Sequence, residues 1–171
     1  MIEAPDYIEP VIGWRVWRIE YRRAGARLTS PMIRTKWPCL EPLEARCAAF
    51  RSFWPGRRTH DVPDVDCQCG IHAASLEAFE EEFVVTTRGE KPRLAIGRVA
   101  LWGRVVEGER GWRGEFAYPD RVFVVVPAAT DGAKGAKIAS ALAGYGVDVG
   151  IVRAPTRRSG LDTLVELAQA A

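Results

Sequence analysis

Three cysteines and one histidine in the first half of the chain have the side chains and the spacing of a zinc site: Cys47, His60, Cys67 and Cys69. Zinc prefers four tetrahedral ligands, drawn from thiolate sulfur and imidazole nitrogen, at positions that converge in space. These residues bracket a proline-containing loop with little apolar sequence, whose ends a metal would tie together. Gly70 follows the Cys-x-Cys pair directly and permits the tight turn that close ligation needs. The sequence therefore predicts one structural zinc ion on these four residues.

The same residue types leave other interpretations open. The cysteines can instead be buried thiols that pack as small hydrophobes, with the histidine on the surface. A redox-active thiol pair is a further alternative, although a disulfide across Cys-x-Cys is strained. If one of the four residues is not a ligand, Cys39 or His72 is the substitute.

A catalytic zinc site would need an open coordination position and a general base. Asp61, Asp64 and Asp66 lie close in sequence, but loop aspartates beside prolines usually make turns. The chain has no Gly-x-Ser-x-Gly motif, and both histidines lie near the cysteines, so a Ser-His-Asp triad is not expected. We therefore assign no catalytic residues.

The segments that must position the metal ligands read mostly as strands. Alternation of apolar and charged residues, rich in tryptophan and valine, has the period of two that is typical of a strand. Glycines inside the later pair of strands indicate bulges of the kind found in small barrels. The later pair forms a long hairpin. In chain order, the strands are expected at residues 12–21, 27–30, 97–107 and 112–118.

Helices are expected at two places in this part of the chain, residues 42–50, which would carry Cys47, and residues 74–80, with Ser75 as a cap. The C-terminal part reads as strand, helix, strand and helix, at residues 121–126, 130–145, 147–152 and 161–170. The predicted fold is α+β and a single domain over residues 1–171. It has a zinc-pinned, mostly antiparallel β-barrel-like body at 1–120 and a strand–helix–strand–helix extension at 121–171.

Four stretches of the chain resemble an uncharacterised family of actinobacterial and phage proteins. The Cys-x-Cys-Gly element is the most distinctive of them, and the resemblance spans roughly residues 10–127. A tyrosine often stands in that family where this chain has His72, which implies that His72 is not a ligand. The resemblance supports the metal site and implies no activity. The stretches are residues 13–17, 60–63, 67–73 and 100–106.

Composition and charge narrow the class of protein. The chain has 171 residues, of which 47% are hydrophobic and 27% charged, as in ordinary globular domains. It has no run near the roughly 20 apolar residues of a membrane helix, and its acidic start is unlike a signal peptide. We therefore expect a cytoplasmic protein with reduced thiols and no membrane partner. The net charge of +2 alone does not indicate nucleic-acid binding.

Tryptophan and arginine are the side chains that could contact a partner. The chain has six tryptophans, and most of them are expected to pack in the core. Two that are flanked by arginine on strands are expected to be exposed, and arginine pairs could contact phosphates. The predicted ligand surface consists of Trp17, Arg57, Arg58, Trp112 and Arg113.

These features favour a non-catalytic, zinc-stabilised binding or adaptor module that recognises protein or nucleic acid. The rival class is an enzyme, either a zinc-dependent hydrolase or a nucleotide-dependent activity that uses the loop after Val126. That loop follows a buried strand and opens a helix, which can hold an anion, but it lacks a phosphate-loop motif. The sequence does not specify an oligomeric state.

Overall fold

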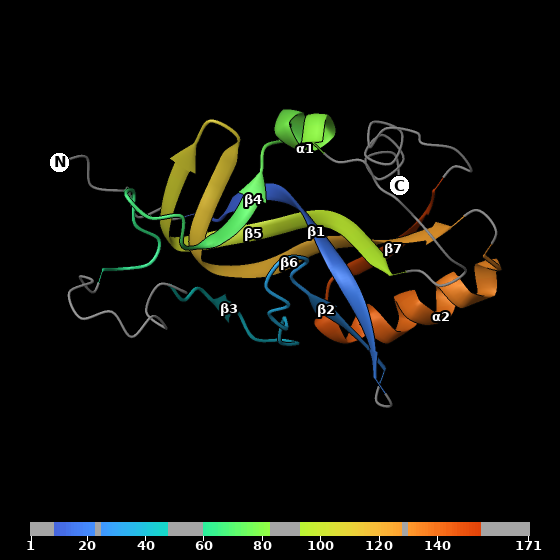
Figure 1. The fold of residues 1–171 in the computed structure, drawn as a ribbon. Helices are drawn as coiled ribbons and strands as arrows, with labels where there is room; N and C mark the ends of the chain where they lie inside the picture. The colour runs from blue at the N-terminus through green and yellow to red at the C-terminus, as the bar shows by residue number, and fades with distance from the viewer. Residues whose placement is uncertain (1–8, 23–24, 48–59, 83–92, 128–129, 155–171) are drawn as a thin grey trace.

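A seven-stranded mixed sheet with few helices forms the protein in the computed structural model, which describes residues 9–22, 25–47, 60–82, 93–127 and 130–154 (Figure 1). All described strand pairs are antiparallel except β6 with β7, which is parallel. The strands are β1 (Val11–Arg22), β2 (Gly25–Thr29), β3 (Leu43–Glu44), β4 (Ile71–Ala74), β5 (Leu94–Gly108), β6 (Gly111–Pro127) and β7 (Asp148–Ala154). The helices are α1 (Leu76–Glu82), α2 (Gly132–Leu142) and the 3-10 helix η2 (Ala143–Tyr145).

The β5–β6 hairpin is the longest part of the sheet, as the alternating sequence predicts. Two register shifts interrupt it, after Arg98 and after Trp102, which confirms the prediction of bulges. β6 continues through Pro119 as one strand, although the sequence indicates two. Pro119 has no N–H to donate, and it lies between the positions where β3 and β7 pair with the same edge of β6.

One edge of β6 pairs with β5, and its other edge takes three partners in succession. Residues 111–114 pair with β4, residues 116–117 with β3, and residues 121–127 with β7. β4 also pairs with β1 at a single position, Trp14 with Ala74, so β1, β5, β6 and β4 are linked in a ring. Within the described residues β2, β3 and β7 each have one partner, so a barrel-like body stays a prediction.

The core lies on both faces of the sheet. Trp17 is 0% exposed and meets Trp37 edge-on, with ring centroids 5.6 Å apart. The neighbouring residue Val16 points to the other face, into a second buried cluster with Phe79 and Phe123. The prediction that Trp17 is exposed is therefore wrong, because β1 is covered on both faces and its charged neighbours do not mark a solvent side.

Cys47 lies on extended chain, and the prediction of a helix over residues 42–50 is wrong for its described part. β3 is a two-residue strand there, and Leu43 pairs with Ala117 of β6. The Ala45 N–H then donates to the Glu115 carbonyl at 2.7 Å. The free edge of β6 thus satisfies backbone groups that a short helix would leave largely unpaired.

The second predicted helix is present as α1, and the Ser75 hydroxyl accepts a hydrogen bond from the Ala78 N–H at 3.2 Å. α2 and β7 follow β6 and bring the chain back parallel to it. The helix predicted at 161–170 lies outside the described residues. No helix in the described part of the chain is both long and apolar enough to cross a membrane.

Candidate metal centre

The four residues that the sequence singles out as ligands lie together in the structure. The ligand atoms of Cys47, His60, Cys67 and Cys69 all lie within 4.8 Å of one another. The Cys47 and Cys67 sulfurs are 3.8 Å apart, and His60 Nε2 lies 3.4 Å from the Cys69 sulfur. These residues are close enough to hold a metal ion.

The free edge of β6 is what brings the cysteines together. Cys47 comes three residues after β3, and Cys69 comes two residues before β4. β3 and β4 pair with adjacent stretches of β6, around Phe116 and Gly114. Cysteines that are distant in sequence therefore meet beside one strand. Cys47 is buried, whereas His60, Cys67 and Cys69 are each partly exposed.

The spacing of the donor atoms fits a tetrahedral ion. Zinc bonds of about 2.3 Å to sulfur and about 2.0 Å to nitrogen imply edges of about 3.8 Å between two sulfurs and about 3.5 Å between sulfur and nitrogen. The Cys47–Cys67 pair at 3.8 Å and the His60–Cys69 pair at 3.4 Å match these edges. A disulfide would need its sulfurs about 2.05 Å apart, and all four cysteines are free.

Arg113 of β6 holds the loop that carries Cys67 and Cys69. Its Nη1 group donates to the carbonyl oxygens of Asp64 at 3.2 Å, of Cys69 at 3.0 Å, and of Cys67 at a shorter distance. One guanidinium thus fixes three backbone positions of the loop that carries two of the ligands. The sequence predicted Arg113 as a partner contact and did not indicate that it holds the metal loop, because the register of β4 on β6 is not readable from the sequence.

Turn chemistry shapes the same loop, as the sequence predicts. Gly70 has φ +119, and a Cβ there would lie 3.0 Å from the Cβ atoms of both Pro63 and Arg113. The Asp64 carboxylate accepts from the Asp66 N–H at 2.9 Å, and the Asp64 carbonyl accepts from the Cys67 N–H at 3.2 Å. These two aspartates therefore build the turn.

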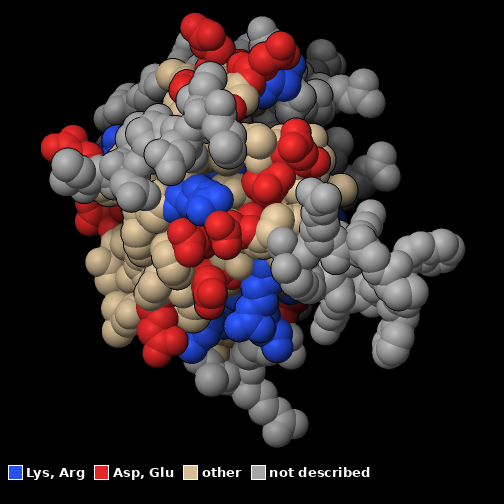
Figure 2. All heavy atoms as spheres, turned by 90° about the vertical axis from the view of Figure 1, so that its left-hand side faces the viewer, with Lys and Arg blue, Asp and Glu red and all other residues tan. Residues whose placement is uncertain are grey.

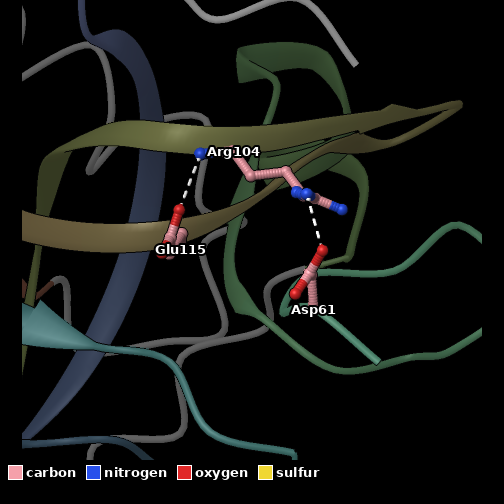
Figure 3. Close-up of polar contacts among 3 residues, drawn as sticks. All are labelled: Asp61, Arg104 and Glu115. Carbon is pink, nitrogen blue, oxygen red and sulfur yellow. Dashed lines mark hydrogen bonds and ion pairs between the residues drawn. The ribbon is translucent and has the colours of Figure 1, made fainter. Parts of the chain in front are cut away.

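Asp61, next to His60 in the chain, is tied to the hairpin (Figure 3). Its carboxylate pairs with the Arg104 guanidinium of β5 at 2.9 Å. The Arg104 N–H donates to the Glu115 carboxylate of β6 at 3.0 Å. Gly103 makes this approach possible, because a Cβ there would lie 2.7 Å from Glu115 Oε2. The loop is thus attached to both strands of the hairpin.

The thiols of the cluster differ in acidity. The pKa of the Cys69 thiol is raised to about 11, first by burial and then by the neighbouring Cys67 and Cys47 sulfurs. The pKa of Cys67 is lowered, first by the Cys69 N–H that donates to its sulfur. Crowded thiolates repel one another, so without a cation Cys69 keeps its proton. A bound metal would displace that proton and neutralise the cluster.

The two substitute ligands lie outside the cluster. His72 Nε2 donates to the Gln68 carbonyl at 3.1 Å, and the pKa of His72 is lowered, mainly by burial. Cys39 packs against the main core cluster. The ligand set predicted from the sequence therefore needs no replacement by either residue.

The residues of the predicted ligand surface do not form one surface in the described part of the chain. Trp17 is in the core, and Arg57 and Arg58 lie outside the described residues. Trp112 is partly buried, and it lines a pocket of about 400 Å³ together with Arg113. Arg113 holds the metal loop, and a partner contact by Trp112 stays a prediction.

Comparison with known proteins adds no function to this geometry. The resemblance to the actinobacterial and phage family stays a prediction. The chain matches no protein-family model, no curated protein and no solved structure.

Proposed function

We propose that Cys47, His60, Cys67 and Cys69 hold one structural zinc ion, and that the chain is a non-catalytic binding module stabilised by this ion. The observation that carries the proposal is the set of four nitrogen and sulfur donors within 4.8 Å of one another. Four such donors complete the tetrahedral coordination of zinc and leave no open position. Three soft thiolates with one imidazole favour zinc over hard cations, which prefer oxygen ligands.

The metal loop, residues 60–70, has little apolar burial to stabilise it. Pro63 is its only buried residue, and Val65 is 69% exposed. Apolar burial therefore contributes little free energy to its fold, and bound zinc would supply the missing part. Three reduced thiolate ligands agree with the predicted cytoplasmic location.

Two features disfavour the rival enzymes. A closed shell leaves no site for the water that a zinc hydrolase activates, and Asp61 is already paired with Arg104. At the loop after Val126, Asp131 caps α2 by accepting from the Ala133 N–H at 3.1 Å. Its carboxylate thus occupies an N–H group that a phosphate would use, and its negative charge would repel a phosphate.

The charge distribution bears on the class of partner. Figure 2 shows basic and acidic side chains interspersed on one face, without a continuous basic surface among its described residues. Nucleic-acid binding depends on neutralising several phosphates. A partner other than nucleic acid therefore fits this face better, and binding to oligonucleotides should be weak and salt-sensitive if it occurs.

Elemental analysis of the purified protein, with thiol titration before and after denaturation, tests the proposal. We expect one zinc per chain and three thiols that react only after unfolding or chelation. Cobalt exchanged into the site should give the visible spectrum of a tetrahedral thiolate complex. Absence of stoichiometric metal, with the thiols of Cys47, Cys67 and Cys69 all reactive in the folded protein, would contradict it.

A further inference from the structure

A pocket of about 480 Å³ lies beside the metal loop. Its walls come from β1, from the connection after β2, from Arg46, from residues 68–70 of the metal loop together with β4, and from α1. This volume is within the range of small-molecule sites, and the lining is mostly apolar. The lining includes Trp14, Arg15, Met32, Ile33, Arg46 and Phe79.

Arg15 lines this pocket and is held in one orientation. Its guanidinium lies over the Trp37 ring, 5.2 Å from the centroid. Nη2 donates to the Ser30 hydroxyl at 3.1 Å, and Nη1 donates to the His72 carbonyl. The Trp37 indole N–H donates to the same hydroxyl at 3.1 Å, which fixes the arrangement. Such a fork is preorganised for a planar anion.

The charge of Arg15 is not matched within the described residues. Its Nε–H is buried and has no hydrogen-bond partner, and no described carboxylate forms an ion pair with it. Burial lowers the pKa of Arg15 to about 10, which shows that its environment disfavours the charge. A partly buried cation of this kind is costly unless an anion accompanies it.

The rest of the pocket has the same charge preference. Arg46 is a second cation in the lining, and among the described residues no Asp or Glu lines the pocket. Trp14 and Phe79 form an apolar wall, with ring centroids 5.6 Å apart. Met32 and Ile33 stand at the rim, 89% and 77% exposed. Large apolar side chains that are this exposed beside a pocket favour a ligand with an apolar body.

We propose that this pocket binds a small organic acid, with its carboxylate on Arg15 and its apolar body against Trp14 and Phe79. Arginine forms paired hydrogen bonds with a carboxylate, and one buried arginine balances one negative charge. A phosphate dianion would call for more donors than this mostly apolar lining offers. The inference rests on the proposed function in one respect, because residues 68–70 of the metal loop form one wall.

Calorimetric titration of the full chain with 4-phenylbutyrate and octanoate tests the proposal. The neutral primary amides of both acids and a tetrapeptide that ends in phenylalanine with a free carboxylate are the comparison ligands. We expect each acid to bind at least about tenfold more tightly than its amide, because only the acid offers a charged acceptor. Equal affinity for acid and amide, or no binding of either acid, would overturn the proposal. A tenfold preference for the peptide would overturn the assignment to a small molecule.

Variants locate the site. Arg15→Gln should weaken binding of the acids by at least about 30-fold, the effect of removing one partner of a buried charged hydrogen bond. Arg46→Gln, at an exposed position, should weaken it by about two- to fivefold. Met32→Glu, at the exposed rim, should weaken binding of the acids more than of the amides, because the added carboxylate repels only the acids. Arg27→Gln removes the same charge from an exposed site outside the pocket and should change nothing.

Zinc content, measured on the same samples, separates this inference from the proposed function. If the protein holds one zinc but binds acid and amide equally, the proposal of an organic-acid ligand is overturned. The proposal of structural zinc then stands. Protein that holds no metal but binds the acids through Arg15 would overturn the zinc site and support the pocket. Unchanged affinity in both Arg46→Gln and Met32→Glu would place any binding elsewhere, which also overturns the proposal.

Discussion

The metal loop and the β5–β6 hairpin lie against each other, yet different interactions stabilise them. Residues 122–126 of β6 are each no more than 1% exposed, and Leu101 and Val99 of β5 are completely buried. In the metal loop only Pro63 is buried, and the loop relies on Arg113, on turn hydrogen bonds and on its cysteines and histidine. The hairpin therefore depends on apolar burial, whereas the loop depends on a few polar contacts and on a metal. Loss of a single ligand should affect the two regions very differently.

The largest expected effect is on the loop. Cys69→Ser should abolish stoichiometric zinc binding and lower the free energy of unfolding by at least about 3 kcal/mol, because metal binding is coupled to folding. Cys39→Ser is the matched control, since Cys39 lies outside the cluster. It should keep one zinc per chain. Denaturant unfolding and metal analysis measure both, and a loss below about 0.5 kcal/mol for Cys69→Ser would contradict structural zinc.

Hydrogen exchange after chelation sharpens the same comparison. Amides of residues 64–70 and of β4 should exchange faster once zinc is removed, because their loop loses its ligand bonds. Amides at the centre of β5 and β6, around Leu101 and Val124, should keep their protection. Uniform loss of protection across both regions would show that the hairpin also depends on the metal.

The next largest effect on stability is expected from the Tyr145 hydroxyl, a polar group in the apolar core. The buried Tyr145 hydroxyl accepts from the Leu28 N–H at 2.9 Å and donates to the Trp37 carbonyl at 2.8 Å. Tyr145→Phe should cost about 1–3 kcal/mol, because two buried groups lose their partner. Tyr21→Phe, at a residue 45% exposed, should cost under about 0.5 kcal/mol.

The same tyrosine predicts a pH dependence. Burial raises the pKa of Tyr145 to about 12, above its ordinary value of 10.0. A raised pKa favours the protonated form in the folded state, so this contribution to stability is complete below pH 10 and is lost as the pH rises toward 12. Unfolding free energies measured across this window should fall more steeply for the native chain than for Tyr145→Phe. Parallel curves would contradict this account.

Arg113 should affect metal affinity more than overall stability. Arg113→Gln removes hydrogen bonds to three loop carbonyls and should weaken zinc binding by about 10–100-fold, the usual effect of losing support for a ligand. Arg121→Gln, on the same strand but over the Phe123 ring, should leave zinc affinity unchanged. Competition with a chromophoric chelator measures both. Equal zinc affinity in the two variants would mean that Arg113 does not position the ligands.

The smallest expected effect comes from the exposed ion pair of Asp61 and Arg104 (Figure 3). A double-mutant cycle with Asp61→Asn and Arg104→Gln should give a coupling free energy of about 0.2–1 kcal/mol, because solvent screens the pair. The coupling should decrease in high salt. A coupling above this range that does not change with salt would contradict the description of this contact as a solvent-screened ion pair.

Much of the metal site could be predicted from the sequence, because few residue types bind zinc and this chain has only four cysteines and two histidines. The strand pattern of β1, β5 and β6 was equally readable from alternation. The prediction of a helix around Cys47 was wrong, because β3 pairs with the open edge of β6 and the sequence does not reveal that long-range contact. The prediction that Trp17 is exposed was wrong for a related reason, since alternation alone does not show that both faces of β1 are covered.

Arg113 and Arg15 show what sequence patterns miss. Each is an arginine beside tryptophan on a strand, and that pattern reads as a solvent-facing pair. Their roles depend on cross-strand neighbours: Arg113 lies opposite His72 of β4, and Arg15 reaches the carbonyl of the same residue from β1. The pocket around Arg15 likewise joins several separate segments, so no local pattern indicates it.

The succession of partners along one edge of β6 has a consequence for the order of folding. β5 and β6 are joined by a two-residue turn, so their pairing closes the shortest loop. β3 and β4 must find an edge that already exists, and the metal ligands meet only when both have done so. We therefore expect zinc uptake during refolding to follow hairpin formation rather than precede it. The rate at which refolding protein takes up zinc would then report on a late step of folding.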